Sequence, residues 1–181
     1  IEDLDKKIVR CVGKADDRFD EDALRMLRAI RFAAQLGFAI DEEAKDAIRR
    51  KHQFLKDVSA ERIQVELTKT LTSAHPEMLK TAYELGMTSV FLPEFDDMMS
   101  TTQNNPHHKY NVGDHTIEVL KNIGPDKVKR LAALLHDVAK PVTKSTDNAG
   151  IDHFYNHYKE SAQMSETILR RLKYDNNTIK G

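Results

Sequence analysis

Residues 18–32, RFDEDALRMLRAIRF, carry the clearest helical periodicity in the chain and constrain its fold more than any other stretch. At about 100° per residue, the apolar side chains gather on one side of a helix, and Arg28 and Arg31 point to the other. Asp20 is the predicted N-cap, and Gly37 stands where a helix commonly ends in the left-handed conformation. An apolar stripe of this width must pack against neighbours, so the stretch predicts a helix buried on one face.

Asp22 and Arg25 depart from this pattern, because Asp22 projects into the apolar arc and Arg25 lies within reach at its border. A carboxylate only accepts hydrogen bonds and a guanidinium only donates them. Cytosine and adenine present an amino donor beside a ring-nitrogen acceptor, whereas uracil and guanine present an oxygen acceptor beside an N–H donor. The pair would therefore accept C and A and reject U and G. The alternative is an ordinary surface salt bridge, which is common at this spacing.

The rest of the sequence also favours helices. Its 181 residues contain only seven glycines and five prolines, and good helix formers are plentiful. Residues 8–12 are β-rich and end at a glycine, so they predict one short strand. We therefore expect an all-α protein with a short strand remnant near the N-terminus. Further helices are predicted at residues 42–51, 60–72 with Ser59 as N-cap, and 76–85.

Composition limits the classes of function. The net charge is −1, so any contact with nucleic acid must come from local basic clusters. Cys11 is the only cysteine, which excludes a disulfide framework and a thiolate zinc site and fits a cytoplasmic protein. No run of about 20 apolar residues predicts a membrane span. The polar residues 96–106 are the predicted boundary between two helical modules, residues 1–95 and 96–181.

A second cluster of polar residues lies in the second module. Residues 131–139 are apolar nearly all round, which predicts a buried helix, yet His136 and Asp137 interrupt it. A buried aspartate needs a partner or a metal ion, and His115 lies one helix earlier. Imidazole and carboxylate together suit a divalent cation, and Lys140 could neutralise Asp137 or hold a phosphate. The alternative is a buried His–Asp–Lys network without metal.

His153 and His157 are four residues apart, which would place them on one face of a helix. A role at a second metal or at a phosphate is one interpretation. Exposed or packing histidines are the other.

Two sets of motifs resemble known families. RFDEDALRMLRAIRF and SAERIQVEL are similar to the neck of bacterial tRNA nucleotidyltransferases, the CCA-adding enzyme and poly(A) polymerase family. The resemblance implies that Glu21, Asp22 and Arg25 form the EDxxR element that recognises the incoming CTP or ATP, with Arg28 at a phosphate. It also implies that the segment with Glu61, Arg62 and Glu66 braces the recognition helix.

PHHKYNVGDHT, RLAALLHDVAKP and HFYNHYKESA resemble an HD domain, a helical metal-dependent phosphohydrolase fold. The resemblance implies His115, His136 and Asp137 as metal ligands, with Asp175 as a candidate fourth ligand. His107 and His108 match histidines that precede this domain in the family, and the domain is expected to be truncated at the C-terminus.

The family resemblance also implies what the chain lacks. The catalytic head, with carboxylates that hold Mg²⁺, is expected before residue 1, so we expect no catalytic residue for nucleotidyl transfer in this chain. The expected function is the portion of a tRNA nucleotidyltransferase that selects ATP and CTP and holds tRNA. The alternatives are a metal-dependent phosphohydrolase acting on phosphomonoesters or 2′,3′-cyclic phosphates, and a non-catalytic tRNA-binding scaffold.

Overall fold

The computed structural model describes residues 2–104 and 110–181, and it confirms the all-α prediction. Short strands accompany the helices as two small two-stranded sheets. The elements of the first part are α1 (Glu2–Asp5), β1 (Ile8–Val9), α2 (Ala15–Glu21), α3 (Leu24–Leu36), β2 (Ala39–Ile40), α4 (Glu42–Lys51), the 3₁₀ helix η1 (His52–Asp57), α5 (Ala60–Leu71), α6 (Met78–Glu84) and α7 (Thr88–Phe91). The later elements are α8 (Pro93–Ser100), α9 (Val112–Asn122), α10 (Lys127–Leu135), α11 (Lys140–Thr143), β3 (Lys144–Thr146), β4 (Asp152–Phe154), α12 (His157–Arg171) and α13 (Asn176–Lys180).

The stretch predicted as one helix starting at Asp20 is two helices, so this prediction was wrong. Asp20 lies within α2, which ends at Glu21, and Asp22 is extended with φ −155° and ψ 104°. The Asp22 carboxylate accepts a hydrogen bond from the backbone N–H of Leu24 at 3.1 Å. A short acidic side chain that bonds its own backbone in this way competes with the helical ladder, which explains the break. The predicted end at Gly37 is confirmed by its φ of 67°.

Helix α3 is the centre of the first core. Most of its apolar side chains are buried, although Phe32 and Leu36 are exposed, and it packs most extensively against α5. Full burial of each large aliphatic side chain stabilises the fold by roughly 1.5–3 kcal/mol. The helix predicted at residues 42–51 is confirmed as α4, and the predicted Ser59 cap is confirmed because its Oγ accepts from the Arg62 N–H. The strand predicted at residues 8–12 is confirmed only over Ile8–Val9, which form β1 and pair with β2 in parallel.

Two predictions in the second part need correction. The helix predicted over residues 131–139 ends at Leu135, and His136 begins a turn that leads into α11. His153 lies on strand β4, not on a helix with His157. The helix begins only at His157 because Asn156 adopts the left-handed conformation, with φ 58°. The two histidines therefore do not share a helix face.

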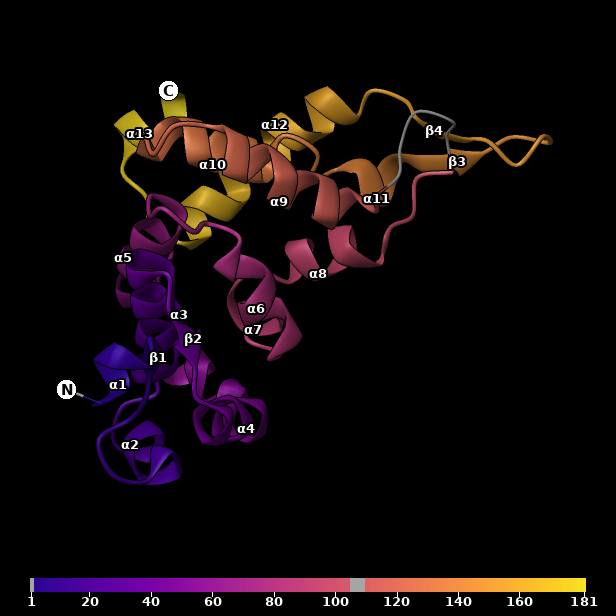
Figure 1. Ribbon diagram of the computed structural model, residues 1–181. Helices are drawn as coiled ribbons and strands as arrows, with labels where there is room; N and C mark the ends of the chain where they lie inside the picture. The colour runs from indigo at the N-terminus through magenta and orange to yellow at the C-terminus, as the bar shows by residue number, and fades with distance from the viewer. Residues whose placement is uncertain (1, 105–109) are drawn as a thin grey trace.

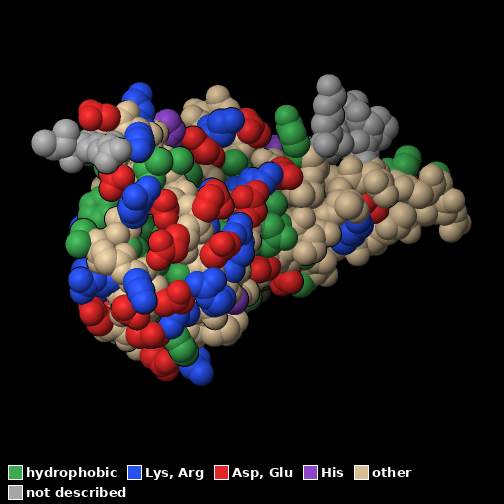
Figure 2. Space-filling view, turned by 60° about the horizontal axis from the view of Figure 1, so that its bottom comes forward, with side chains coloured by type: hydrophobic (Ala, Val, Ile, Leu, Met, Phe, Trp, Pro, Cys, Tyr) green, Lys and Arg blue, Asp and Glu red, His purple; other side chains and the backbone are tan. Residues whose placement is uncertain are grey.

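Figure 1 shows the N-terminal helices as one arm and α9, α10 and α12 as a layer across its end, from which the β3–β4 hairpin projects. The C-terminal segment ties the two parts together, because the Tyr174 hydroxyl lies 2.9 Å from Thr68 Oγ1. Arg130 also donates to the carbonyl of Leu71 at 2.8 Å. The predicted boundary at residues 96–106 begins inside α8, and the division into two modules stays a prediction. Acidic and basic side chains nearly balance in number, and they are interspersed over the rounded part of the face in Figure 2.

Candidate functional sites

The first candidate site lies at the break between α2 and α3. Asp22 is held there by two donors: Leu24 N–H on one carboxylate oxygen and the Arg62 guanidinium, at 2.8 Å, on the other. Burial alone would raise the pKa of Asp22, but the hydrogen bonds from Arg62 and Leu24 outweigh it, so the pKa lies below its ordinary value. Asp22 is therefore an ionised, acceptor-only group at neutral pH.

Arg25 does not pair with Asp22, so the alternative of an ordinary salt bridge between these two residues is wrong. Its Nη1 donates to Glu21 and, at 3.2 Å, to the carbonyl of Arg18. The helix break turns Asp22 towards α5 and leaves Glu21, the last residue of α2, as the nearer carboxylate. Among the described residues no partner is found for Nε and the second amino group of Arg25. Both side chains are thus fixed by separate partners, and both keep hydrogen-bonding capacity.

Two separate hollows receive these side chains. Asp22 lines one of about 420 Å³ together with Arg62 and Phe54. Arg25 lines another of about 290 Å³ with Arg18 and Cys11. Asp22 and Arg25 therefore lie on a hollowed surface, with 24 % and 37 % of their side chains exposed.

Glu66 links α5 to the arginine row of α3. It is 4 % exposed, and its carboxylate lies 3.5 Å from Arg28 Nε and 3.2 Å from Arg31 Nε. The Arg31 contact is an ion pair without good hydrogen-bond geometry. Together with the Arg62 contact to Asp22, this pairing fits the predicted bracing of α3 by α5. Arg28 is 44 % exposed, so it remains accessible to an anion.

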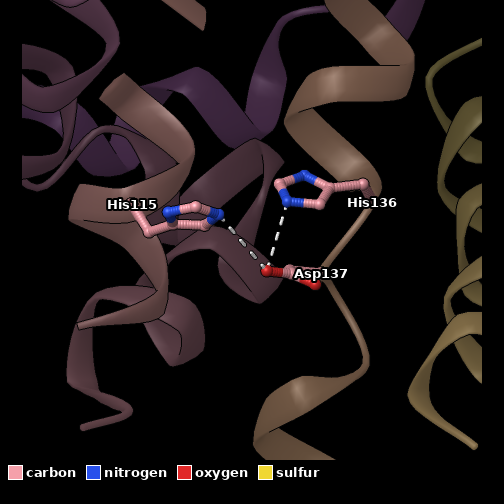
Figure 3. Close-up of side chains that lie close together, drawn as sticks. All are labelled: His115, His136 and Asp137. Atoms are coloured by element: carbon pink, nitrogen blue, oxygen red, sulfur yellow. Dashed lines mark ion pairs between the residues drawn. The ribbon is translucent and has the colours of Figure 1, made fainter. Parts of the chain in front are cut away.

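The second candidate site is built around Asp137, which is 4 % exposed. His115 on α9 and His136 after α10 direct Nε2 at Asp137 Oδ2, at 3.9 and 3.2 Å (Figure 3). One ligand atom from each of these residues lies within 4.8 Å of the others. The structure therefore brings together the three residues predicted as metal ligands.

Lys140 and His157 complete the surroundings of Asp137. The buried Lys140 ammonium lies 2.8 Å from Asp137 Oδ2 and 2.9 Å from Gln103 Oε1. Of the two roles expected for Lys140, this contact fits neutralisation of Asp137. His157 Nε2 lies 3.6 Å from the other oxygen, Oδ1. Gln103 was not predicted, because its contact with Lys140 spans 37 residues and leaves no trace in local sequence.

The ring nitrogens indicate which atoms face a ligand. His136 Nδ1 lies 2.7 Å from the carbonyl of Ala133, and His157 Nδ1 lies 2.7 Å from that of Phe154. A carbonyl oxygen only accepts hydrogen bonds, so the Nδ1 atom of each histidine carries the proton. In a neutral ring with this tautomer, Nε2 directs a lone pair towards Asp137. Lone pairs facing a carboxylate require a proton or a cation between them. The donor set therefore fits a divalent cation.

Electrostatic interactions in this cluster favour the charged forms of both His136 and Asp137. Burial lowers the pKa of His136, but the hydrogen bond to Asp137 outweighs it and raises the pKa above its ordinary value. Burial likewise raises the pKa of Asp137, and His136 and Lys140 outweigh it, so the pKa lies well below its ordinary value.

Other predicted residues lie apart from the cluster. Asp175 caps α13 by accepting from Thr178 and pairs with Lys127, so the structure does not bring it to Asp137. His153 pairs with Asp147 and stacks on Tyr155 in the hairpin region. His107 and His108 lie outside the described residues.

Comparisons with known proteins show which family the chain is related to. A family model described as the probable RNA- and SrmB-binding site of polymerase A matches residues 37–99. The CCA-adding enzyme of Bacillus subtilis (strain 168) is 52 % identical over 69 residues, 38 % of this chain and 17 % of the relative. The CCA-adding enzyme of Lactobacillus helveticus is 30 % identical over 174 residues, 96 % of this chain and 39 % of the relative. The A-adding tRNA nucleotidyltransferase of Deinococcus radiodurans is 31 % identical over 194 residues, 99 % of this chain and 43 % of the relative.

A solved structure extends the comparison to the fold. The crystal structure of Bacillus stearothermophilus CCA-adding enzyme in complex with CTP aligns with a TM-score of 0.62 and 24 % identity, over 99 % of this chain and 37 % of that one. The chain spans less than half the length of each of these relatives. Within the described residues, no helix combines the length and apolar character needed to cross a membrane. The predicted relationship is confirmed: the chain is a relative of the tRNA nucleotidyltransferases and corresponds to part of the length of the CCA-adding enzymes.

Proposed function

We propose that this chain is the part of a tRNA nucleotidyltransferase that selects the incoming CTP or ATP and holds tRNA. The observation that carries the proposal is that Asp22 and Arg25 are each fixed by a separate partner and each line a hollow. In this proposal Mg²⁺ and the catalytic carboxylates belong to a head supplied by another part of the whole protein. The match to an RNA-binding family model over residues 37–99 supports the contact with tRNA.

The chemistry of selection follows from these two side chains. Each Asp22 oxygen already accepts one hydrogen bond and keeps lone-pair capacity for an amino group. Arg25 keeps donors for a ring nitrogen, because Glu21 and the Arg18 carbonyl engage only Nη1. Cytosine and adenine satisfy both groups, whereas uracil and guanine would place acceptor against acceptor and donor against donor. Arg28 would meet a phosphate in competition with Glu66.

Equilibrium binding to this chain tests the proposal. We expect CTP and ATP to bind more tightly than UTP and GTP, measured by isothermal titration calorimetry or fluorescence anisotropy. Asp22→Ala should remove this preference by weakening the binding of CTP and ATP. Asp20→Ala is the matched control, because Asp20 lines the same hollow but pairs with Lys51. Four equal affinities in the wild type, or an unchanged preference in Asp22→Ala, would overturn the proposal.

A second candidate function is metal-dependent hydrolysis of phosphate esters, as in HD domains. The observation in its favour is the convergence of His115, His136 and Asp137, with Lys140 beside them. A divalent cation bound there would supply an activated water. The protein's own residues would hold the cation through Nε2 and carboxylate oxygens, and Lys140 would lie beside it, paired with Asp137.

Metal analysis and hydrolysis of 4-nitrophenyl phosphate with Mn²⁺, Ni²⁺, Co²⁺ or Mg²⁺ test this second function. Bound metal that disappears in Asp137→Ala, together with hydrolysis, would support it. Absence of both in the wild type would contradict it. Salt-sensitive tRNA binding without turnover would then assign the module to a non-catalytic scaffold.

A further inference from the structure

Lys140 carries a buried ammonium group that is shared between two acceptors. Its Nζ lies 2.8 Å from Asp137 Oδ2 and 2.9 Å from Gln103 Oε1. The ring centroid of Phe154 is 5.3 Å from the same nitrogen, which adds a cation–π attraction but no acceptor oxygen. Within the part of the chain that the structure describes, the position of this positive charge is therefore a balance between Asp137 and Gln103.

The side-chain amide of Gln103 has one orientation that satisfies both of its ends. Gln103 is 6 % exposed, and its Nε2 donates to the carbonyl of Tyr110 at 3.3 Å. A carbonyl oxygen only accepts and an ammonium group only donates, so turning the amide over would place like against like at both ends. Oε1 is therefore directed at Lys140.

The hairpin of β3 and β4 fixes the backbone on both sides of Gln103. Lys144 Nζ donates to the carbonyl of Thr102 at 2.8 Å. The N–H of Asn104 donates to the buried Asp152 carboxylate at 2.7 Å, and the N–H of Asp152 donates to the carbonyl of Asn104 at 3.1 Å. The amide oxygen that faces Lys140 is thus held on a backbone segment with few freedoms.

The acceptor that Lys140 occupies on Asp137 is the oxygen on which the cluster converges. Nε2 of His115 and Nε2 of His136 lie 3.9 and 3.2 Å from the same Oδ2. A divalent cation held by these three residues would share that oxygen with the ammonium group. Like charges repel strongly where little water screens them, so the ammonium group opposes the cation.

We propose that Lys140 is an internal competitor for the cation at this cluster, and that Gln103 is the positioning residue that sets the strength of the competition. By accepting from the ammonium group, Gln103 holds part of its interaction away from Asp137. The inference rests on the second proposed function, because it concerns the cation site of that function. It names what regulates the cation affinity of the site.

Two substitutions of Gln103 should change this affinity in opposite directions. Gln103→Met keeps the size of the side chain but leaves Lys140 with Asp137 as its acceptor, so Mn²⁺ should bind about tenfold more weakly. Gln103→Glu offers Lys140 a carboxylate and draws it from Asp137, so Mn²⁺ should bind about tenfold more tightly. Isothermal titration calorimetry with Mn²⁺ measures both. Gln163→Glu is the matched control, because it adds the same charge at an exposed position of α12.

Removing the competitor distinguishes positioning from a general structural effect. Lys140→Met should bind Mn²⁺ more tightly than the wild type. In the double variant with Gln103→Met, the affinity should equal that of Lys140→Met, because Gln103 acts only through the ammonium group. Thermal denaturation shows which variants are folded, and Gln103→Glu with Lys140→Gln provides the same comparison if the methionine variants are unfolded.

The outcomes separate this inference from the function on which it rests. Wild-type binding that is unchanged in both Gln103 variants, or weaker in Lys140→Met, would overturn the inference alone. Binding by Lys140→Met but not by the wild type would support it, since the competitor would then block the site completely. Absence of Mn²⁺ binding in both proteins would overturn the inference together with the metal-dependent function.

Discussion

Replacing Asp137 with asparagine tests whether this carboxylate is the charge centre of the second module. The substitution keeps the shape and one acceptor oxygen but removes the negative charge beside Lys140, whose side chain is only 9 % exposed. Removing one partner of a buried ion pair typically costs about 3–5 kcal/mol. Lys140 keeps its contact to Gln103 Oε1 at 2.9 Å, so we expect the lower end of that range. The predicted loss in free energy of unfolding is about 3 kcal/mol.

Urea denaturation of metal-free protein, followed by circular dichroism, measures this loss. In a chain of this size, 3 kcal/mol corresponds to a fall in Tm of roughly 6–12 °C. Asp147→Asn is the matched control, because Asp147 pairs with His153 at the surface, where ion pairs contribute at most about 1 kcal/mol. If Asp137→Asn cost no more than the control, Asp137 would not be the buried counter-ion that the geometry implies.

Three further predictions concern stability. Burial raises the pKa of Tyr174 to about 12 despite its hydrogen bond with Thr68, so the neutral phenol is favoured in the folded state. The stability gained from the neutral phenol is complete below the unfolded pKa of about 10 and is lost as pH rises towards 12. Tyr174→Phe should therefore flatten the fall in the free energy of unfolding over this interval, measured by alkaline denaturation. An unchanged slope would contradict this prediction. Ser59→Ala should lower the free energy of unfolding in urea by about 0.5–1 kcal/mol through loss of the helix cap, and no loss would show that the cap is not formed in solution. Glu66→Ala should cost about 2–4 kcal/mol in the same assay because it leaves Arg31 without its buried carboxylate, whereas a loss below about 1 kcal/mol would mean that solvent compensates Arg31.

Local chemistry explains which parts of the fold could be predicted. The helix at residues 42–51 and the Ser59 cap were predictable, because periodicity and capping act between neighbouring residues. The break at Asp22 was not, since it depends on a bond to Leu24 and on Arg62, which lies 40 residues away. Propensity alone favours one continuous helix through this stretch.

The same distinction applies to the candidate sites. His136 and Asp137 were predictable as a pair because charged groups inside an apolar run must be satisfied. The separation of His153 from His157 depends on the left-handed Asn156, which a count of helical spacing does not detect. The alternative of a salt bridge between Asp22 and Arg25 is wrong because spacing alone could not show that the break would turn Asp22 away from Arg25.

The central claim is that Asp22 and Arg25 select the nucleotide by the pairing edge of its base. The most direct test is nucleotide incorporation into tRNA by the complete enzyme, comparing kcat/KM for CTP and ATP with that for UTP and GTP. We predict that Asp22→Ala lowers this discrimination by about 100-fold or more, as expected when a site built to hydrogen-bond its substrate loses its partner, and that Asp20→Ala leaves it intact. Discrimination in Asp22→Ala equal to that of the wild type would contradict the account.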